Sequence, residues 1–209
     1  MKKILIPLLL SLSFSATAQW SIGGKAGVTF SNYKTKSPWE EISNIGYSVG
    51  LTGFKKINSN FGFNFELQYI QKGYNHQICD TYYDKLKGNY IEIPILFDYG
   101  FIIPSLDNFR AHFNLGFYSA YWISGEYETK IDEDAFTENF DFDRSGASRF
   151  DFGPSGGARV EYILKNGSLS LDFRYELGLI DLQKKASDDT NNSNRAMIIG
   201  ISYLKPIGN

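Results

Sequence analysis

Large apolar side chains alternate with small or polar ones along much of this sequence, and this period of two constrains the fold more than any other feature. In segment 61–69 every odd position is Phe, Leu or Tyr, whereas Gly62, Asn64, Glu66 and Gln68 occupy the even positions. Successive side chains of a β-strand point to opposite faces. The segment is therefore predicted to be a strand with one apolar and one polar face.

The same alternation recurs along the chain and predicts eight strands. These are segments 20–30, 47–54, 61–69, 90–99, 109–123, 150–164, 169–177 and 196–203. Most are near the ~9–11 residues that a tilted strand needs to cross a bilayer. Short links at 55–60, 100–108 and 165–167 alternate with long ones at 31–45, 73–88, 125–148 and 180–195. Short turns at one end and long polar loops at the other are typical of an outer-membrane barrel whose long loops face outward.

The first eighteen residues have the pattern of an export signal. Lys2 and Lys3 precede an apolar run, 4–12, and the small residues Ala16 and Ala18 follow it. This order predicts a secretory signal peptide at 1–18 that is cleaved before Gln19, and a single barrel domain at 19–209. After Gln19 no apolar stretch approaches the ~20 residues of a membrane-spanning helix. The formal charge of −2 also argues against a nucleic-acid partner, which needs a strongly basic face.

The direction of the apolar face separates two fold classes. A soluble lipocalin-like carrier turns it inward, whereas an outer-membrane barrel turns it toward lipid. The crowding of Phe61, Phe63 and Phe65 on one face suits lipid better than a small core, which must interdigitate large and small side chains. We therefore expect an all-β, eight-stranded antiparallel up-and-down transmembrane β-barrel. Tyrosines near the segment ends are predicted to form its interfacial girdles: Tyr47, Tyr69, Tyr90, Tyr99, Tyr121, Tyr162, Tyr175 and Tyr203.

Four short blocks add a family resemblance. Segments 24–32, 66–73, 90–96 and 178–182 occur in the order of the recurring blocks of the PorT-like outer-membrane β-barrel family, which the chain resembles. The resemblance implies an eight-stranded barrel in the outer membrane of a Gram-negative cell and, for some members, a part in protein secretion. Such barrels commonly end on an aromatic residue, whereas here six residues follow Tyr203. The resemblance leaves the end of the last strand open.

The polar faces of the predicted strands would line the barrel interior with charge. The charged residues predicted there are Lys25, Glu66, Glu92, Asp98, Arg110, Asp151, Arg159, Glu161, Asp172, Arg174 and Glu176. An eight-stranded barrel is only wide enough for its own side chains, so these groups are predicted to pair and to leave no open pore. Acids exceed bases by three, and the excess is expected to lie near the wet rims, to hold a proton or to attract a cation.

Two prolines and one histidine raise further alternatives. Pro94 and Pro154 lie inside predicted strands, where they indicate a β-bulge or a bend of the wall. His76 lies in the second long loop near Asp80 and Asp84, and such a pair could act as a general base in a barrel hydrolase. No nucleophile motif, phosphate-binding loop or metal-ligand cluster accompanies it, so no catalytic activity, cofactor or metal is predicted.

The expected function is therefore structural or partner-binding. The expected partners are outer-membrane lipid and, through the long loops, other envelope or secretion proteins. The loop 125–148 is strongly acidic, and we interpret it as solvated surface because charge runs usually are. Three alternatives stay open: a narrow channel or transporter, a soluble lipocalin-like carrier, and an outer-membrane barrel hydrolase.

Overall fold

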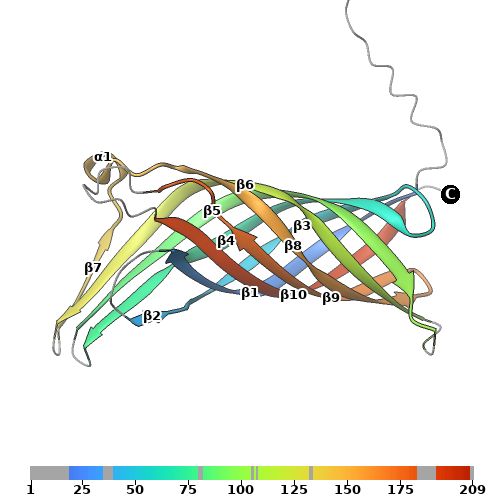
Figure 1. Cartoon of the computed structure of the whole chain (residues 1–209), viewed down its shortest axis with the longest axis horizontal. Coiled ribbons are helices and arrows are strands. Elements are labelled where there is room, and N and C mark those ends of the chain that lie inside the picture. Colours follow the sequence, from blue (N-terminus) through green and yellow to red (C-terminus); the bar gives the residue numbers. More distant parts are fainter. Residues whose placement is uncertain are drawn as a thin grey trace, which may run out of the picture.

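The chain folds into one closed, antiparallel β-barrel (Figure 1). The structure is a computed structural model that describes residues 19–34, 40–79, 82–104, 106, 108–131, 134–182 and 192–207. The predicted signal peptide, 1–18, lies outside them. The strands are β1 (Trp20–Lys34), β2 (Glu40–Ile42), β3 (Asn44–Lys56), β4 (Phe61–Cys79), β5 (Tyr82–Ile102), β6 (Phe109–Ile131), β7 (Asp134–Asn139), β8 (Phe150–Leu164), β9 (Gly167–Leu177) and β10 (Ser193–Ile207).

Eight of these strands form the barrel wall. Their order around the ring is β3-β1-β10-β9-β8-β6-β5-β4, and the β3–β4 pairing closes it. Every pairing in the wall is antiparallel. Each joins wall strands that follow one another in the chain, except the pairing that joins the first strand, β1, to the last, β10. The short strands β2 and β7 pair with β4 and β6 outside the ring. The predicted eight-stranded up-and-down barrel is therefore confirmed.

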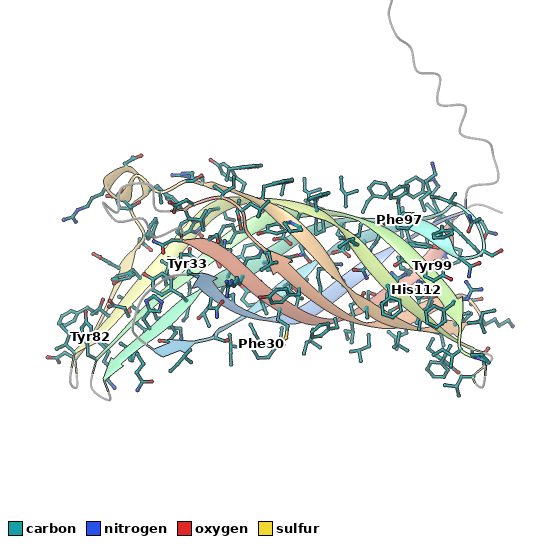
Figure 2. The ribbon with its side chains drawn as sticks, in the orientation of Figure 1. Phe30, Tyr33, Tyr82, Phe97, Tyr99 and His112 are labelled. Carbon is teal, nitrogen blue, oxygen red and sulfur yellow. The ribbon has the colours of Figure 1, made fainter. Side chains whose placement is uncertain are left out.

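The apolar face of the wall points outward. Phe63, Phe65, Leu171 and Phe173 are exposed, whereas Glu66 and the other polar residues between them are buried inside the ring. In Figure 2 the labelled Phe97 and Tyr99 lie on this outer surface near one end of the barrel. A lipocalin-like carrier requires the opposite orientation, so that alternative is wrong. No helix in the described part of the chain is long and apolar enough to cross a membrane.

The two ends of the barrel differ. The short-turn end carries the connections 57–60, 103–108 and 165–166, and both termini of the described chain meet there because Trp20 pairs with Ile207. The long-loop end carries the connections between β1 and β3, β4 and β5, β6 and β8, and β9 and β10. The predicted alternation of short and long connections holds for three of these four, whereas residues 80–81 alone join β4 to β5. Strand β10 continues four residues past Tyr203, which fixes the end of the last strand.

Two of the four long connections are largely strand, so the loops predicted at 73–88 and 125–148 are wrong in extent. Strands β4 and β5 remain paired as far as Cys79 and Tyr82, and β6 runs to Ile131 before returning as β7. Helix α1 (Phe142–Ser145) follows, with an Asp141 N-cap and a left-handed Gly146 at φ 63°. Beyond the lipid-facing belt the outward face of these strands carries polar residues such as Gln71 and Lys85, so hydropathy no longer marks the strand while the backbone pairing continues.

Neither proline shifts the strand register. Pairing between β4 and β5 keeps one register on both sides of Pro94, and that between β6 and β8 runs unbroken through Pro154. The β-bulge considered at these positions is therefore wrong, and the alternative, a bend of the wall, stays a prediction. The register shift of β5 against β6 lies instead at Asn89–Tyr90, opposite Ile123. This bulge marks the place where the wall continues into the projecting hairpins, since bulges kink a strand and increase its twist.

Candidate functional site

The candidate site is the polar interior of the barrel. Alternation directs one residue in two of every wall strand inward, and eight strands enclose a space that side chains can fill. Charged side chains from β1, β4, β5, β6, β8 and β9 meet there. They form three groups along the barrel axis, which we call the central triad, the upper triad and the lower cluster.

The central triad consists of Lys25, Glu66 and Arg174. Glu66 receives two hydrogen bonds from Arg174, with Nη1 at 2.7 Å from Oε2 and Nη2 at 2.6 Å from Oε1. Lys25 Nζ lies 2.7 Å from the same Oε2. The fork of a guanidinium matches a carboxylate, so this contact fixes β9 against β4 across the lumen. The triad has one net positive charge and is almost completely buried.

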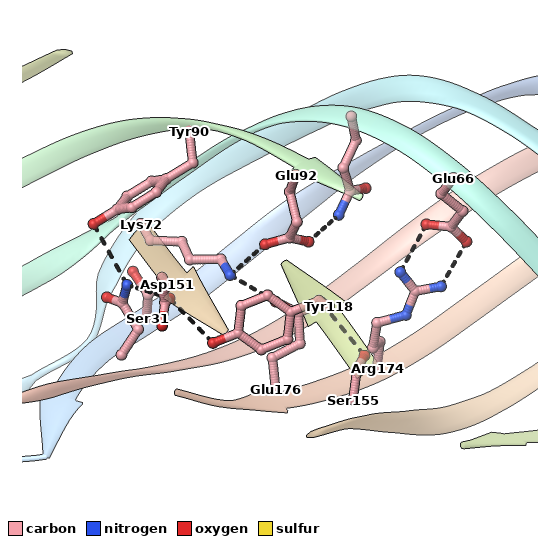
Figure 3. A network of polar contacts seen from close by, with 12 residues as sticks. Ser31, Glu66, Lys72, Tyr90, Glu92, Tyr118, Asp151, Ser155, Arg174 and Glu176 are labelled. Carbon is pink, nitrogen blue, oxygen red and sulfur yellow. Dashed lines mark hydrogen bonds and ion pairs between the residues drawn. The ribbon is translucent and has the colours of Figure 1, made fainter. Parts of the chain in front are cut away.

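The upper triad consists of Lys72, Glu92 and Glu176 (Figure 3). Lys72 Nζ lies 2.5 Å from Glu92 Oε2 and 2.7 Å from Glu176 Oε2, and its ammonium lies 4.2 Å from the centre of the Tyr118 ring. Gln68 donates a further hydrogen bond to Glu92. This triad has one net negative charge, which balances the net positive charge of the central triad. Arg174 and Glu176 are alternate residues of β9, so the two triads adjoin.

Two more of the predicted acids have uncharged partners. Asp151 Oδ2 accepts hydrogen bonds from Asn194 at 2.8 Å and from the Tyr118 hydroxyl at 3.1 Å. Asp172 accepts a hydrogen bond from Ser202 at 2.8 Å. We predicted that the excess acids would lie at wet rims, hold a proton or attract a cation. Hydroxyl and amide donors contact these two carboxylates inside the barrel and away from the rims, but Asp151 Oδ1 has no hydrogen-bond donor among the described residues. That these acids hold a proton or attract a cation stays a prediction.

The lower cluster lies at the short-turn end, where Figure 2 labels His112. The His112 ring lies between two carboxylates, with Nδ1 2.7 Å from Asp98 Oδ1 and Nε2 3.1 Å from Glu161 Oε2. Arg159 forms an ion pair with the other oxygen of Asp98 at 3.2 Å. Gly100 makes room for the ring, because a Cβ there would lie 2.6 Å from His112. Arg110, which projects from β6 next to His112, is half-buried beside this cluster.

An aromatic plug closes the interior at the long-loop end. It comprises the buried side chains of Tyr33, Tyr90, Tyr118, Trp122 and Leu182. Phe140 stacks on the Trp122 ring at 4.6 Å between centroids, and Phe142 meets its edge at 4.9 Å. The segment between β7 and β8 thus folds back over the mouth. Tyr90 was predicted in the outer girdle, but it shares the inward face of β5 with Glu92, so that prediction is wrong.

Sequence reasoning missed one central residue, Lys72. The predicted strand stopped at Tyr69, although the inward parity that places Glu66 and Gln68 in the lumen continues through Ile70 to Lys72. Following the alternation three residues further would have placed Lys72 in the lumen. Of the eleven predicted interior residues, Lys25, Glu66, Glu92, Asp98, Asp151, Arg159, Asp172, Arg174 and Glu176 are buried, whereas Arg110 and Glu161 are half-buried at the short-turn end.

The histidine considered for catalysis lies in a strand. His76 belongs to β4, stacks on Tyr74 at 4.5 Å, and is the register partner of Asp84 in β5. Asp84 accepts a hydrogen bond from Thr129 at 3.1 Å. Asp80, the other acid considered, lies outside the described residues. Across the described residues, no group of three or more His, Cys, Asp or Glu side chains could hold a metal ion.

Comparison with known proteins decides the family. A sequence model of the family described as outer membrane protein beta-barrel domain matches residues 13–184, which is most of the chain. The chain belongs to this family. As a member of the outer membrane protein beta-barrel domain family, it is an outer membrane protein, in agreement with its outward apolar face. No curated protein matches it at a significant level.

Solved structures of outer-membrane proteins align with the chain at low sequence identity. Neisserial surface protein A, NspA, aligns with a TM-score of 0.50 at 13% identity, over 89% of this chain and 96% of that one. OprG from Pseudomonas aeruginosa aligns with a TM-score of 0.46 at 15% identity, over 90% and 95%. Ail, the attachment invasion locus protein of Yersinia pestis, aligns with a TM-score of 0.43 at 13% identity, over 88% and 97%. At these identities the likeness concerns the fold alone.

Proposed function

We propose that this protein is a sealed outer-membrane barrel that acts by binding a protein partner at its long-loop end. The observation that carries the proposal is the sheet that β4, β5, β6 and β7 form beyond the lipid-facing belt (Figure 1). Strand β4 continues seven residues past Lys72, a chain length of roughly 23 Å at ~3.3 Å per residue. A barrel that only anchored itself in the membrane would not need this projection.

The projecting sheet is held together by side chains as well as by its backbone. The Tyr83 hydroxyl donates to Glu128 at 2.6 Å, and Thr129 donates to Asp84 at 3.1 Å, so both contacts join β5 to β6. At its base, Trp122 donates to the backbone carbonyl of Ser124 at 2.7 Å and stacks on Phe140. A sheet fixed in this way can present a binding surface with little loss of conformational entropy.

Strand β7 offers the binding edge. Among the described residues it pairs with β6 alone, and all six of its residues are exposed, including Phe136 at 63%. An open edge provides unpaired backbone groups to which an extended segment of another protein can add as a further strand. Asp134 and Glu138 make this edge acidic, so the partner segment that fits it is extended and basic.

The interior supports a binding role over transport. Two interlocked triads and the aromatic plug fill the lumen, and an eight-stranded wall leaves no additional width for a solute. The protein is accordingly proposed to be neither a channel nor an enzyme. The PorT-like blocks of the sequence support membership of that subgroup and a part in protein secretion, with the long-loop end facing out of the cell.

Site-specific photo-cross-linking in cells tests this function. A photoreactive amino acid at Phe136, on the β7 edge, is expected to capture one discrete protein, whereas the same group at Lys205, at the short-turn end, is not. Glu138→Lys should reduce the Phe136 cross-link at least several-fold because it reverses charge on the edge. Asp143→Lys makes the same charge change on α1, away from the edge, and should leave it intact.

Two outcomes would overturn the proposal. The first is equal cross-linking from Phe136 and Lys205, which would indicate contact without a site. The second is an equal loss with Glu138→Lys and Asp143→Lys, which would indicate general charge attraction and no strand addition at β7. Fractionation of each variant with the outer membrane confirms that the compared proteins are folded.

A further inference from the structure

A cavity of about 300 Å³ opens at the short-turn end, at the opposite end of the barrel from the proposed partner site. Asp98, His112 and Glu161 of the lower cluster line it, together with Arg110, Lys56 and Phe54. Its size is at the lower limit of pockets that hold small organic ligands. Side chains from β3, β5, β6 and β8 converge on it, so the folded barrel preforms the cavity.

The acidic groups of the cavity already have charged partners, although Asp98 Oδ2 receives no hydrogen bond among the described residues and is balanced by an ion pair alone. His112 lies between Asp98 and Glu161, and Arg159 pairs with Asp98 from behind the cavity wall. These contacts neutralise much of the negative charge without any ligand. A cation would therefore have to displace existing partners of the two carboxylates.

The basic groups differ in this respect. Arg110 Nε is buried and has no hydrogen-bond acceptor among the described residues. Its cross-strand neighbour is Glu161, whose carboxylate contacts His112. Lys56 and Lys165 also line the cavity. A buried guanidinium donor without an acceptor is costly, and an oxyanion is the ligand that a guanidinium fork matches best.

The remaining wall is partly apolar, alongside polar residues such as Ser21, Asn60 and Ser168. Its apolar residues are Phe54, Ile163, Leu164 and Pro206. The guanidinium carbon of Arg159 lies 5.4 Å from the centre of the Phe54 ring. Apolar walls with a few converging polar groups are typical of sites for small organic molecules. A bare inorganic ion would leave this surface uncovered.

We propose that this cavity binds a small organic anion, with its carboxylate or phosphate oxygens on Arg110 and its apolar part against Phe54. Lys56 and Lys165 at the entrance add attraction for the negative charge, so affinity should fall as salt rises. The proposal does not depend on the partner site at β7, because the two sites lie at opposite ends of a filled lumen.

The signal of the Arg110 Nε–H group tests the proposal directly. The full chain is folded in a non-ionic detergent and titrated with benzoate, phenyl phosphate, inorganic phosphate or the neutral benzamide, and the arginine Nε–H resonances are followed by NMR. Benzoate or phenyl phosphate should shift the Arg110 resonance in a saturable manner. The stronger of these two identifies the preferred oxyanion, whereas benzamide should produce no saturable shift and inorganic phosphate only a weaker one.

Variants separate the site from general charge. Arg110→Gln should weaken binding of the preferred anion at least tenfold, and Lys130→Gln, which removes one positive charge at the opposite end, should leave it unchanged. If Arg110→Gln does not fold, Lys56→Gln and the wild-type titration provide the same test. Benzamide binding as tightly as benzoate, inorganic phosphate binding as tightly as phenyl phosphate, or the absence of any saturable shift would overturn the proposal.

Discussion

Lys72 Nζ lies 2.7 Å from Glu176 Oε2, although the two residues are 104 positions apart in the chain. The same ammonium contacts Glu92 of β5, so one side chain connects β4, β5 and β9 across the lumen. All three side chains are buried, and the charges of the triad are compensated mainly by one another and by the adjoining central triad. The closed interior of this barrel depends on that pairing.

Replacing Lys72 with Met should destabilise the barrel by about 3–5 kcal/mol, because it leaves Glu92 and Glu176 buried without their cation. The free energy of unfolding, measured by urea titration in lipid vesicles, gives this value. Adding Glu176→Gln should recover part of the loss. Lys85→Met, in the projecting hairpin, is the matched control and should change stability by less than about 0.5 kcal/mol. Equal stability of the Lys72 variant and the wild type would refute the role of the upper triad.

Glu66 and Arg174 should be energetically coupled. In a double-mutant cycle with Glu66→Gln and Arg174→Met, we expect a coupling energy of about 1.5 kcal/mol or more, because their two-pronged contact is buried. The same unfolding measurement supplies all four corners of the cycle. A parallel cycle between Glu66 and the distant Lys85 should be additive within about 0.5 kcal/mol. Additivity in both cycles would contradict the contact.

The outward apolar face predicts a position-dependent cost for charge. Leu171 lies near the middle of β9 and is 56% exposed on the lipid face. Leu171→Arg should cost about 2–4 kcal/mol, the range for arginine at the bilayer midplane. Phe136→Arg, on the water-exposed β7, should cost less than about 0.5 kcal/mol. Folding yield and unfolding free energy in vesicles measure both, and a reversed ranking would show that the apolar face does not meet lipid.

Trp122 should hold the β6–β7 hairpin and α1 over the mouth. Trp122→Ala removes its stacking on Tyr90 and Phe140 and its hydrogen bond to Ser124, a loss of about 3–5 kcal/mol for a buried aromatic side chain. Limited proteolysis should then cleave the segment between β7 and β8 much faster, while the barrel strands stay protected. Trp20→Ala, at the short-turn end, should leave that rate unchanged. An unaltered cleavage rate in the Trp122 variant would show that the plug does not restrain the hairpin.

The wall of the barrel could be predicted from the sequence because lipid on one side and a polar lumen on the other give every strand a period of two. Phe63 and Phe65 against Glu66 already define both faces of β4, and the structure keeps that parity throughout. The same rule failed where its physical cause ends. Past Lys72 and Ile123 the outward face is no longer regularly apolar, so the projecting strands lack the clear alternation and were taken for loops.

The sequence could predict which residues line the candidate site, but it could not predict which of them contact one another. Parity assigns Glu176 and Arg174 to the lumen, but only the register and shear of the closed ring decide that Glu176 contacts Lys72 and that Arg174 contacts Glu66. The prediction that Tyr90 lies in the outer girdle was wrong because tyrosine is common both in girdles and in barrel interiors. Its position two residues before Glu92 places it inside.

Conductance of the purified, folded protein in a planar lipid bilayer tests the sealed lumen most directly. With the two triads and the aromatic plug in place, the recordings are expected to show no discrete steps at any applied potential. Reproducible, ion-selective steps from the wild type that disappear on Lys72→Met would contradict the sealed barrel and show that ions pass along the interior.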